Sequence, residues 1–511
     1  MNGRKRWVVA LMHLLGADVI VAPSRAWSAQ PMPSGAWAGE VRRGAESTFF
    51  GLELKPEANG VAMRMWMPAL HAYGVPAGVA ARNPDGFAQP DSQVRFRLED
   101  DALVGTFGEP PLPFTLRRAS GPMPAPPAPV AASQGPSPVW QYATGAALWA
   151  SPVVDHGVVY AVDAAGTLHA VRAVDGSPVF RRALGTPLHG DPVIAGGAVF
   201  LLGDDGTLYK LDAARGDTLW RRTLGGGAVA RSLPGPPTSA YDPRAPVFDY
   251  RSATPVIIEG AIYLPTADGA LHALAVGDGK TLWRRVIGGT LRAAAAAAGD
   301  RLVVGSWDGW VTCVSRADGS VLWRFDTGGP VTNPPLVAGR LVIVGSRSSD
   351  LFALDVKSGR VAWKRYHWMS WVESTPSLAG GVLYVGSSDG RVVRALDAVT
   401  GREAWSTDVG GWSWGTPLVL GDSVIAAQSA MVPYYVPLEA SLVALDRRSG
   451  AILWKRPANA ALMNGFVGYA SSPARAGDLV IVARADGQLE AYRPAEARTP
   501  ADRGDLPKAR D

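Results

Sequence analysis

A repeated alternation of short apolar runs and polar turns dominates the chain from residue 139 to residue 494. Seven of the eight repeats open with a polar residue followed by proline, and the repeat near Ala294 has lost this pair. Each repeat continues through apolar runs separated by glycine-containing turns and ends in a run that begins with an aromatic residue. Apolar runs of this length, bounded by glycine and aspartate, predict strands rather than helices. Four short strands in a repeat of about forty residues are typical of a β-propeller blade.

The aromatic residue that begins the last strand of each repeat gives the number of blades. Successive spacings between these residues are 40, 40, 63, 40, 40, 42 and 49. Eight opening strands and eight aromatic strands predict an all-β protein with an eight-bladed β-propeller. The eight positions are Trp140, Phe180, Trp220, Trp283, Trp323, Trp363, Trp405 and Trp454.

The order of the elements predicts how the ring closes. The segment that begins at Val139 has the sequence of an outermost strand but precedes the first opening strand, so we expect it to complete the eighth blade. Such a pairing leaves no open edge in the ring. The longer spacings place insertions at Gly226–Tyr250 and around Gln428–Leu438, and insertions in propellers are loops that often shape the binding face.

Three other segments surround the propeller domain, which we place at residues 139–494. Residues 35–119 contain short alternating strands, with Val61, Met63 and Met65 on one face, and predict a small antiparallel β domain. Residues 121–138 hold seven prolines and predict an extended linker with few contacts. Residues 495–511 are expected to form a polar tail.

The first 28 residues have the pattern of a secretory signal peptide. They combine a basic start, an apolar stretch from Trp7 to Val21, and a small-x-small cleavage motif at residues 26–28. His13 and Asp18 interrupt the apolar stretch, which argues against a permanent transmembrane helix. We therefore expect a periplasmic or secreted protein with no transmembrane segment after the signal.

Composition excludes several classes of protein. The 511 residues include a single cysteine, Cys313, so an intramolecular disulfide, a CxxCH haem attachment and a cysteine-based zinc site are excluded. A net charge of +5 does not by itself predict nucleic-acid binding, and we expect none. The 18 tryptophans are many more than usual, and the aromatic position of the repeat accounts for part of that number.

The end of each repeat resembles the tryptophan-docking repeat, AxDxxTGxxxW, of pyrroloquinoline-quinone (PQQ) propeller proteins. The segment Ala395–Trp405 matches it in full, Ala353–Trp363 and Ala444–Trp454 match with serine in place of threonine, and Lys210–Trp220 and Cys313–Trp323 are degenerate copies. The resemblance implies that the aromatic residue packs between neighbouring blades. It also places Cys313 in an alanine position of the core, where we expect no reactive thiol.

The proteins that share this repeat fall into two functional classes. Quinoprotein dehydrogenases hold PQQ and Ca²⁺ on the propeller axis, whereas scaffolds of the BamB type assemble outer-membrane proteins without catalysis. The chain lacks the adjacent cysteine pair of the alcohol dehydrogenases, and it also departs from the scaffolds in its extra N-terminal domain and missing lipid-anchoring cysteine. Our first hypothesis is a non-catalytic binding or assembly scaffold with a protein partner in the cell envelope and no cofactor. The alternative is a PQQ- and calcium-dependent dehydrogenase that oxidises an alcohol or sugar.

Residues that precede each opening proline are expected to lie near the propeller axis. Two interpretations stay open for them: a cup that binds a planar anionic ligand by stacking and arginine pairing, or a plug of side chains that bind one another. If Glu373 and Asn333 coordinated Ca²⁺, their oxygen atoms would suit it. In a scaffold, substitutions of these two residues are expected to be nearly silent. The candidate residues are Trp149, His189, Asp249, Arg251, Arg292, Asn333, Trp371, Glu373, Trp412, Trp414 and Tyr469.

Overall fold

The computed structural model describes residues 32–44, 46–89, 93–108, 111–128, 132–226, 231, 248–434 and 436–494. These residues form two compact units, which divide at residues 129–130 and are described separately. The predicted signal peptide, the polar tail and most of the Gly226–Tyr250 insertion lie outside the described residues.

The N-terminal unit is a closed antiparallel barrel in which each strand pairs with the next and the last pairs with the first. The predicted apolar face is confirmed, since Val61, Met63, Met65 and Met67 are all buried. Phe50 lies between Phe107 and Phe114 in the interior, with ring centroids 4.9 and 5.0 Å apart. The strands are β1 (Gly35–Arg43), β2 (Glu46–Glu57), β3 (Gly60–Met67), β4 (Ala72–Asn83), β5 (Gly86–Gln89), β6 (Val94–Glu99), β7 (Ala102–Phe107) and β8 (Leu112–Arg118), with a 3-10 turn η2 (Pro68–Leu70).

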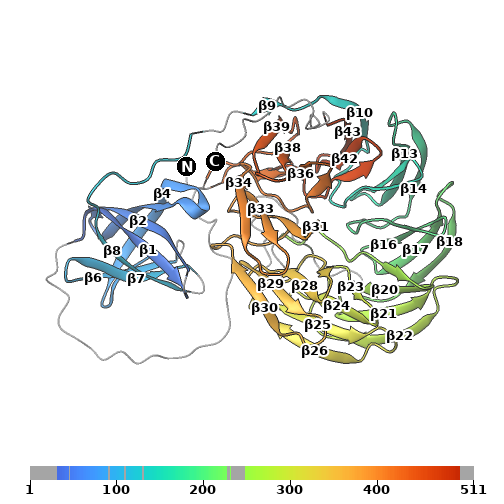
Figure 1. Ribbon diagram of the computed structural model, residues 1–511, viewed down its shortest axis with the longest axis horizontal. Helices are drawn as coiled ribbons and strands as arrows, with labels where there is room; N and C mark the ends of the chain where they lie inside the picture. The colour runs from blue at the N-terminus through green and yellow to red at the C-terminus, as the bar shows by residue number, and fades with distance from the viewer. Residues whose placement is uncertain are drawn as a thin grey trace, which may run out of the picture. The chain divides into compact units, whose positions relative to one another are not determined.

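The second unit is an eight-bladed β-propeller, as the repeat predicts (Figure 1). Blades 1 to 4 contain β11 (Val153–Asp155), β12 (Val158–Val162), β13 (Thr167–Arg172) and β14 (Pro178–Ala183); β15 (Val193–Ala195), β16 (Ala198–Leu202), β17 (Thr207–Asp212) and β18 (Thr218–Thr223); β19 (Val256–Ile258), β20 (Ala261–Pro265), β21 (Ala270–Ala275) and β22 (Thr281–Val286); β23 (Ala296–Ala298), β24 (Arg301–Gly305), β25 (Trp310–Ser315) and β26 (Val321–Asp326).

Blades 5 to 7 follow the same order, and blade 8 is completed from the start of the domain. They contain β27 (Leu336–Ala338), β28 (Leu341–Gly345), β29 (Asp350–Asp355) and β30 (Val361–Tyr366); β31 (Ser377–Ala379), β32 (Val382–Gly386), β33 (Val392–Asp397) and β34 (Glu403–Asp408); β35 (Leu418–Leu420), β36 (Ser423–Ala427), β38 (Ser441–Asp446) and β39 (Ile452–Pro457); β41 (Ala474–Ala476), β42 (Leu479–Ala483), β43 (Gln488–Tyr492) and β10 (Pro138–Ala143). The smaller insertion contains β37 (Ser429–Met431), which pairs with β40 (Phe466–Gly468) from the loop between blades 7 and 8.

The ring closes where the element order predicts. Strand β10 pairs antiparallel with β43 and becomes the outermost strand of blade 8. Across this pair, the Gln141 side-chain amide donates a hydrogen bond of 2.7 Å to the buried Glu490 carboxylate. Trp140 packs into a cluster with residues of β12 and β13 in blade 1 and of β42 and β43 in blade 8, so one side chain joins the two ends of the domain.

Seven of the eight aromatic residues of the outermost strands lie against a glycine of the following blade. The Trp140 ring lies against Gly176, where a Cβ atom would stand 2.7 Å from the ring. That glycine also has a φ of +72°, so a side chain is excluded both by the ring and by the backbone. The Trp140 indole N–H donates a hydrogen bond of 2.8 Å to the carbonyl of Ala173 in the same turn. Equivalent contacts join Phe180 to Gly216, Trp220 to Gly279, Trp283 to Gly319, Trp323 to Gly359, Trp363 to Gly401 and Trp405 to Gly450.

Trp454 requires a different partner. In blade 8 the third strand, β43, and the outermost strand, β10, come from opposite ends of the domain, so no turn with a docking glycine joins them. The proline-rich linker supplies this partner: β9 (Ser133–Gln134) pairs parallel with β39 as a fifth strand of blade 7, and Gly135 lies against the Trp454 ring. The expectation of a linker with few contacts is therefore wrong for this stretch. The linker replaces the missing docking turn.

Cys313 lies in the core between blades 4 and 5, together with Val303 and Val342. It is fully buried, and burial raises the pKa of its thiol to about 11. The thiolate is the reactive form, so this cysteine is an inert core residue, as its position in the repeat indicates.

His272 in β21 is expected to make stability depend on pH. Burial, with a smaller contribution from Arg284, lowers the pKa of His272 to about 4. The unfolded chain binds this proton near pH 6.5, so stability is fully present above that pH and falls as the pH drops towards 4, by at most about 3 kcal/mol. We expect His272→Leu to flatten this part of the decline in urea unfolding between pH 7 and pH 5. His156→Gln, at an exposed imidazole, is the control and should change the decline little.

Candidate functional site on the propeller axis

The loop that leads from each blade to the next places one residue at the same distance before each inner strand. This residue stands four positions before the first residue of β11, β15, β19, β23, β27, β31, β35 and β41. Because the blades repeat around the axis, the eight residues occupy equivalent places around it, and all of them are buried. We call this set the axial ring: Trp149, His189, Ser252, Arg292, Thr332, Glu373, Trp414 and Ala470.

The axial ring contains five of the residues that the sequence singled out: Trp149, His189, Arg292, Glu373 and Trp414. Sequence reasoning missed Ser252, Thr332 and Ala470. In blade 5, Pro335 rather than Pro334 directly precedes the inner strand, so Thr332 and not Asn333 is the equivalent position. The register of the strands is the signal that identifies these residues.

Aromatic side chains fill one side of the axial site. The rings of Trp412 and Trp414 are stacked with centroids 4.8 Å apart, and Tyr250 stacks on Trp414 at 5.4 Å. Phe466 lies 5.3 Å from Trp149 and 5.8 Å from Trp414. Three of the predicted aromatic residues, Trp149, Trp412 and Trp414, are therefore brought together, but they pack against aromatic side chains of the chain itself.

Arg251 reaches across the axis to the loops of three other blades. Its guanidinium donates to the Asn333 side-chain oxygen at 3.2 Å, to the Trp414 carbonyl at 2.9 Å and to the Ala470 carbonyl at 3.3 Å. It also lies 5.2 Å from the centre of the Tyr250 ring. A single side chain thus links the loops that precede blades 5, 7 and 8.

Glu373 forms a buried ion pair with Arg347, a residue from the turn between β28 and β29 that sequence reasoning missed. The other carboxylate oxygen accepts a hydrogen bond of 2.8 Å from the Thr332 hydroxyl. The Arg347 guanidinium lies 4.4 Å from the Trp307 ring centre and 4.5 Å from that of Trp371, which contributes cation–π attraction. Both charged side chains are 2% exposed, so the pair is removed from water.

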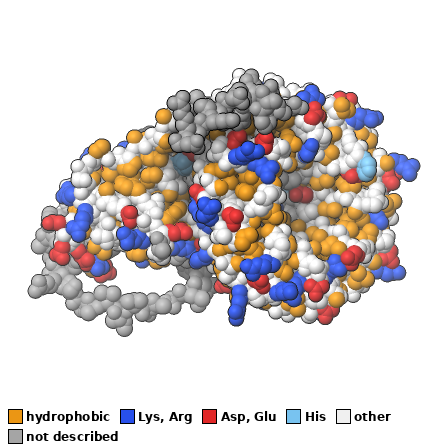
Figure 2. Space-filling view, in the orientation of Figure 1, with side chains coloured by type: hydrophobic (Ala, Val, Ile, Leu, Met, Phe, Trp, Pro, Cys, Tyr) orange, Lys and Arg blue, Asp and Glu red, His pale blue; other side chains and the backbone are white. Residues whose placement is uncertain are grey.

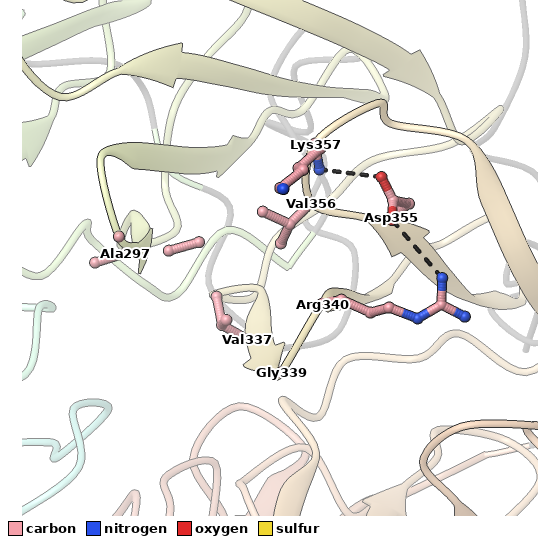
Figure 3. Close-up of a pocket in the computed structure, with 9 residues that line it drawn as sticks. Ala297, Val337, Gly339, Arg340, Asp355, Val356 and Lys357 are labelled. Carbon is pink, nitrogen blue, oxygen red and sulfur yellow. Dashed lines mark hydrogen bonds and ion pairs between the residues drawn. The ribbon is translucent and has the colours of Figure 1, made fainter.

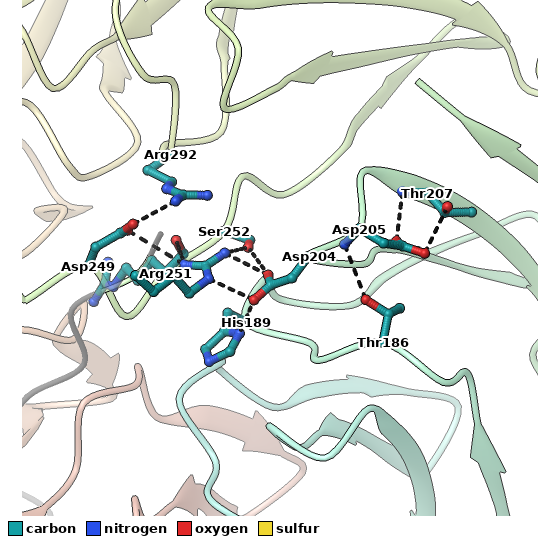
Figure 4. Close-up of polar contacts among 10 residues, drawn as sticks. Thr186, His189, Asp204, Asp205, Thr207, Asp249, Arg251, Ser252 and Arg292 are labelled. Atoms are coloured by element: carbon teal, nitrogen blue, oxygen red, sulfur yellow. Dashed lines mark hydrogen bonds and ion pairs between the residues drawn. The ribbon is translucent and has the colours of Figure 1, made fainter. Parts of the chain in front are cut away.

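A second ionic network lies at the loops of blades 2 to 4 (Figure 4). Arg231 binds the Asp204 carboxylate with nitrogen–oxygen distances of 2.6 and 2.7 Å, and the His189 ring nitrogen Nδ1 lies 2.9 Å from the same carboxylate. Burial pushes the pKa of Asp204 upward, but hydrogen bonds from His189 and Arg231 hold it well below its usual range. Asp249 accepts a hydrogen bond of 2.6 Å from Arg292.

Tyr469 lies apart from this site. Its side chain packs with Val480 and Val482 of blade 8, and its hydroxyl donates a hydrogen bond of 3.0 Å to Glu490 in β43. Glu490 also accepts hydrogen bonds from Tyr492 and Arg484. Tyr469 therefore belongs to the network that supports the closure of blade 8.

The residues present do not fit a calcium ion at Glu373 and Asn333. Ca²⁺ takes about six to eight oxygen ligands, but one Glu373 oxygen is paired with a guanidinium and the Asn333 oxygen accepts from Arg251. Within the described ranges, no group of three or more histidine, cysteine, aspartate or glutamate residues is placed to hold a metal ion. The arginines stand where a calcium-binding site would need additional oxygen atoms.

A cavity of about 530 Å³ lies at the other end of the blades, between blades 4 and 5 (Figure 3). It is lined by the inner strand of blade 4, by the turn after the inner strand of blade 5, which contains Arg340, and by the connection from β29 to β30, which contains Asp355 and Lys357. Asp355 accepts a hydrogen bond of 3.1 Å from the Lys357 backbone N–H and lies 4.0 Å from Arg340. Antiparallel connections put these turns on the face opposite the axial ring, and none of the sequence-predicted site residues lines this cavity.

The fold and the axial site define an eight-bladed propeller of the PQQ-like class. The family model described as outer membrane protein assembly factor BamB matches residues 130–294, 267–375 and 368–502. The chain belongs to this family. A sequence comparison with curated proteins finds no match.

Solved structures agree with this assignment at the level of the fold. BamB from Moraxella catarrhalis is similar with a TM-score of 0.52 and 16% identity over 71% of this chain and 99% of that one. Quinohemoprotein alcohol dehydrogenase from Comamonas testosteroni is similar with a TM-score of 0.54 and 14% identity over 70% and 76% of the two chains. The computationally designed Ika8 protein has a TM-score of 0.54 and 15% identity over 70% and 99%. An assembly factor, an enzyme and a designed protein thus share this fold.

The surface has no dominant charge on the face that is drawn. Figure 2 shows lysine and arginine side chains interspersed with aspartate and glutamate over the propeller. Among the residues that the structure describes, no helix has the length and apolar composition needed to cross a bilayer.

Proposed function

We propose that this protein is an exported, non-catalytic scaffold of the cell envelope that binds a protein partner through the loop face of its propeller. The main support is that the axis is closed by its own side chains. Arg251 spans it by hydrogen bonds to three blades, and Arg347 neutralises the Glu373 carboxylate. A cofactor at this place would have to displace both arginines.

The position of the insertions supports the loop face as the binding surface. The Gly226–Tyr250 insertion connects β18 to β19, and the insertion near Gln428 connects β36 to β38. In the alternating order of antiparallel strands, both connections lie at the same end of the blades as the axial ring. Loops grouped on one end of a rigid scaffold are a common place for binding. The family to which the chain belongs is described as an assembly factor, which also supports a protein partner.

The cofactor hypothesis is tested by titrating the purified full chain with PQQ and excess Ca²⁺ while recording tryptophan fluorescence. Because the aromatic site is filled and the residues do not fit calcium, we expect no saturable quenching at micromolar PQQ. Saturable quenching that is reversed by a calcium chelator would favour the alternative, a PQQ-dependent dehydrogenase acting on an alcohol or sugar. That result would justify a screen for dye-linked oxidation.

The binding face is tested by site-specific photo-crosslinking in intact cells. A photoreactive residue at Ala165, exposed in the turn between β12 and β13, is expected to give a discrete adduct with an envelope protein. The matched control is Ala297, which is also exposed but lines the cavity on the opposite face. Adducts formed only from Ala297, or adducts formed equally from both positions, would contradict the proposed face.

A further inference from the structure

The outer edge of β39 shows that a blade of this propeller can take up an additional strand. Among the strands that the structure describes, β39 is the outermost strand that has a fifth strand beside it, and the other seven blades have four strands each. The added strand, β9, comes from the linker and runs parallel to β39. Addition of an extended segment to a sheet edge is a common mode of peptide recognition, in which backbone hydrogen bonds supply affinity and side-chain pockets supply specificity.

Three consecutive linker residues define what this edge accepts. The Ser133 hydroxyl donates a hydrogen bond of 2.6 Å to one backbone carbonyl of β39, and the Gly135 backbone N–H donates one of 3.0 Å to another. A Cβ atom on Gly135 would stand 2.6 Å from the Trp454 ring, so a larger residue would have to displace the ring. Gln134 between them is exposed. The edge therefore selects an extended segment with a hydroxyl residue, any residue and glycine in succession.

The linker fills this edge only in part. Register pairing covers two of the six residues of β39, since Trp454 pairs with Ser133 and Lys455 pairs with Gln134. Both linker residues are exposed, and neither brings an apolar side chain to the blade. The short connection to β10 holds β9 beside the edge at a high effective concentration, so the segment stays in place with few contacts. A longer strand with the same pattern can therefore replace it.

The other docking contacts do not allow such a replacement. In blade 1, for example, Gly176 belongs to the turn between β13 and β14, where its backbone N–H donates a hydrogen bond of 2.9 Å to the Arg172 carbonyl. Withdrawing this glycine from Trp140 would require blade 1 to open. Gly135 precedes β10 and belongs to no turn of a blade, so it can leave Trp454 while all eight blades stay folded.

The direction of β39 connects this edge with the loop face. In the alternating order of antiparallel strands, the fourth strand of a blade runs towards the end that carries the axial ring. A segment added parallel to β39 therefore leaves the edge at the loop face. The sheet of β37 and β40 belongs to connections at that same end, so one partner can reach both surfaces.

We propose that the edge of β39 is a strand-addition site for a partner protein and that β9 is its intramolecular occupant. The partner presents an extended segment of serine or threonine, any residue and glycine. This segment pairs parallel to β39, places its glycine on the Trp454 ring and displaces β9. The inference rests on the proposed function, because it states how the envelope partner is recognised, and it adds the side of blade 7 to the binding surface.

The site is tested with the purified full chain and a fluorescent synthetic peptide with the sequence of residues 131–137, whose fluorescence anisotropy reports binding. Gly135→Val should release β9, because the new side chain meets the Trp454 ring. This variant should bind the peptide at least about tenfold more tightly than the wild type, in which β9 competes. A peptide with valine in place of its glycine should bind neither protein. Equal affinity for the two peptides, or for the two proteins, would overturn the proposal.

Disulfide trapping gives a second test that does not depend on the folding of Gly135→Val. The peptide carries an activated disulfide at the position of Gln134 and is added to Lys455→Cys. The matched control is Lys364→Cys, at the equivalent position of blade 5, where Gly401 of blade 6 covers the neighbouring Trp363. Cys313 is buried and does not compete. We expect the peptide to couple at least about tenfold faster to Lys455→Cys, and equal rates would reject the site.

Two further outcomes separate this inference from the proposed function and from self-association. Peptide binding without an adduct from Ala165 in cells would support the strand-addition site and reject the proposed loop face, whereas an adduct without peptide binding would do the reverse. Sedimentation of the full chain identifies the remaining occupant. A dimer that is absent in Gly135→Val would assign the edge to the linker of a second copy and overturn the partner segment.

Discussion

Replacing Glu373 by alanine is expected to destabilise the propeller by about 3–5 kcal/mol, because Arg347 is then left buried without its partner. The ion pair is almost fully removed from solvent, and the guanidinium is enclosed by Trp307 and Trp371. Loss of the carboxylate also leaves the Thr332 hydroxyl without its acceptor. Chemical denaturation followed by near-ultraviolet circular dichroism measures the change.

Two further variants separate the loss of the pair from other effects. In the double variant Glu373→Gln with Arg347→Met, both charges are absent, so most of the lost stability should return. Asp278→Ala, which breaks the exposed pair of Asp278 and Lys280, should change stability little. If Glu373→Ala costs less than about 1 kcal/mol, the Arg347 guanidinium reaches water in the variant and the pair has no structural role.

This prediction reverses an expectation drawn from the sequence alone. A scaffold was expected to tolerate changes at Glu373 and Asn333, because no ligand would depend on them. The structure shows that both residues bind arginines that close the propeller axis. Glu373 pairs with Arg347, and Asn333 accepts a hydrogen bond from Arg251. Sensitivity to substitution at Glu373 therefore does not distinguish an enzyme from a scaffold, whereas PQQ binding does.

The propeller could be predicted from the sequence because its contacts are repeated and local. In blades 1 to 6 each strand pairs with the next strand of the chain, and the docking contact of Trp140 with Gly176 recurs from blade to blade up to Trp405. The barrel was predicted only as a small antiparallel domain. Its closure joins β1 to β8 from opposite ends of the domain, and alternation along single strands does not encode that pairing.

The axial site could be predicted in position but not in chemistry. Five of the residues that the sequence singled out stand in the axial ring, since the repeat fixes where each loop arrives, whereas Tyr469 lies apart from it. Their partners Arg347 and Arg231 come from a turn and an insertion, and the repeat does not specify how far those side chains reach. A glutamate at such a position has the same appearance in the sequence whether a metal ion or a guanidinium neutralises it.

Trp140→Ala is expected to destabilise the propeller by about 3–5 kcal/mol. The side chain fills a cluster formed by blades 1 and 8, and its N–H pairs with the Ala173 carbonyl. Truncation leaves a cavity at the junction where the ring closes and removes the partner of that carbonyl. Because β10 is held in blade 8 by pairing with β43 alone, the weakened strand should also detach more often than any internal strand.

Limited proteolysis and denaturation together test this closure. Trp140→Ala should speed cleavage near β10 under native conditions as well as lower the unfolding midpoint, since local opening of the strand precedes global unfolding. The matched control is Trp310→Ala, at a tryptophan that is 38% exposed in β25, and it should alter neither measurement strongly. Equal destabilisation by the two variants, or unchanged cleavage near β10 in Trp140→Ala, would mean that backbone pairing and the Gln141–Glu490 contact close the ring without the indole.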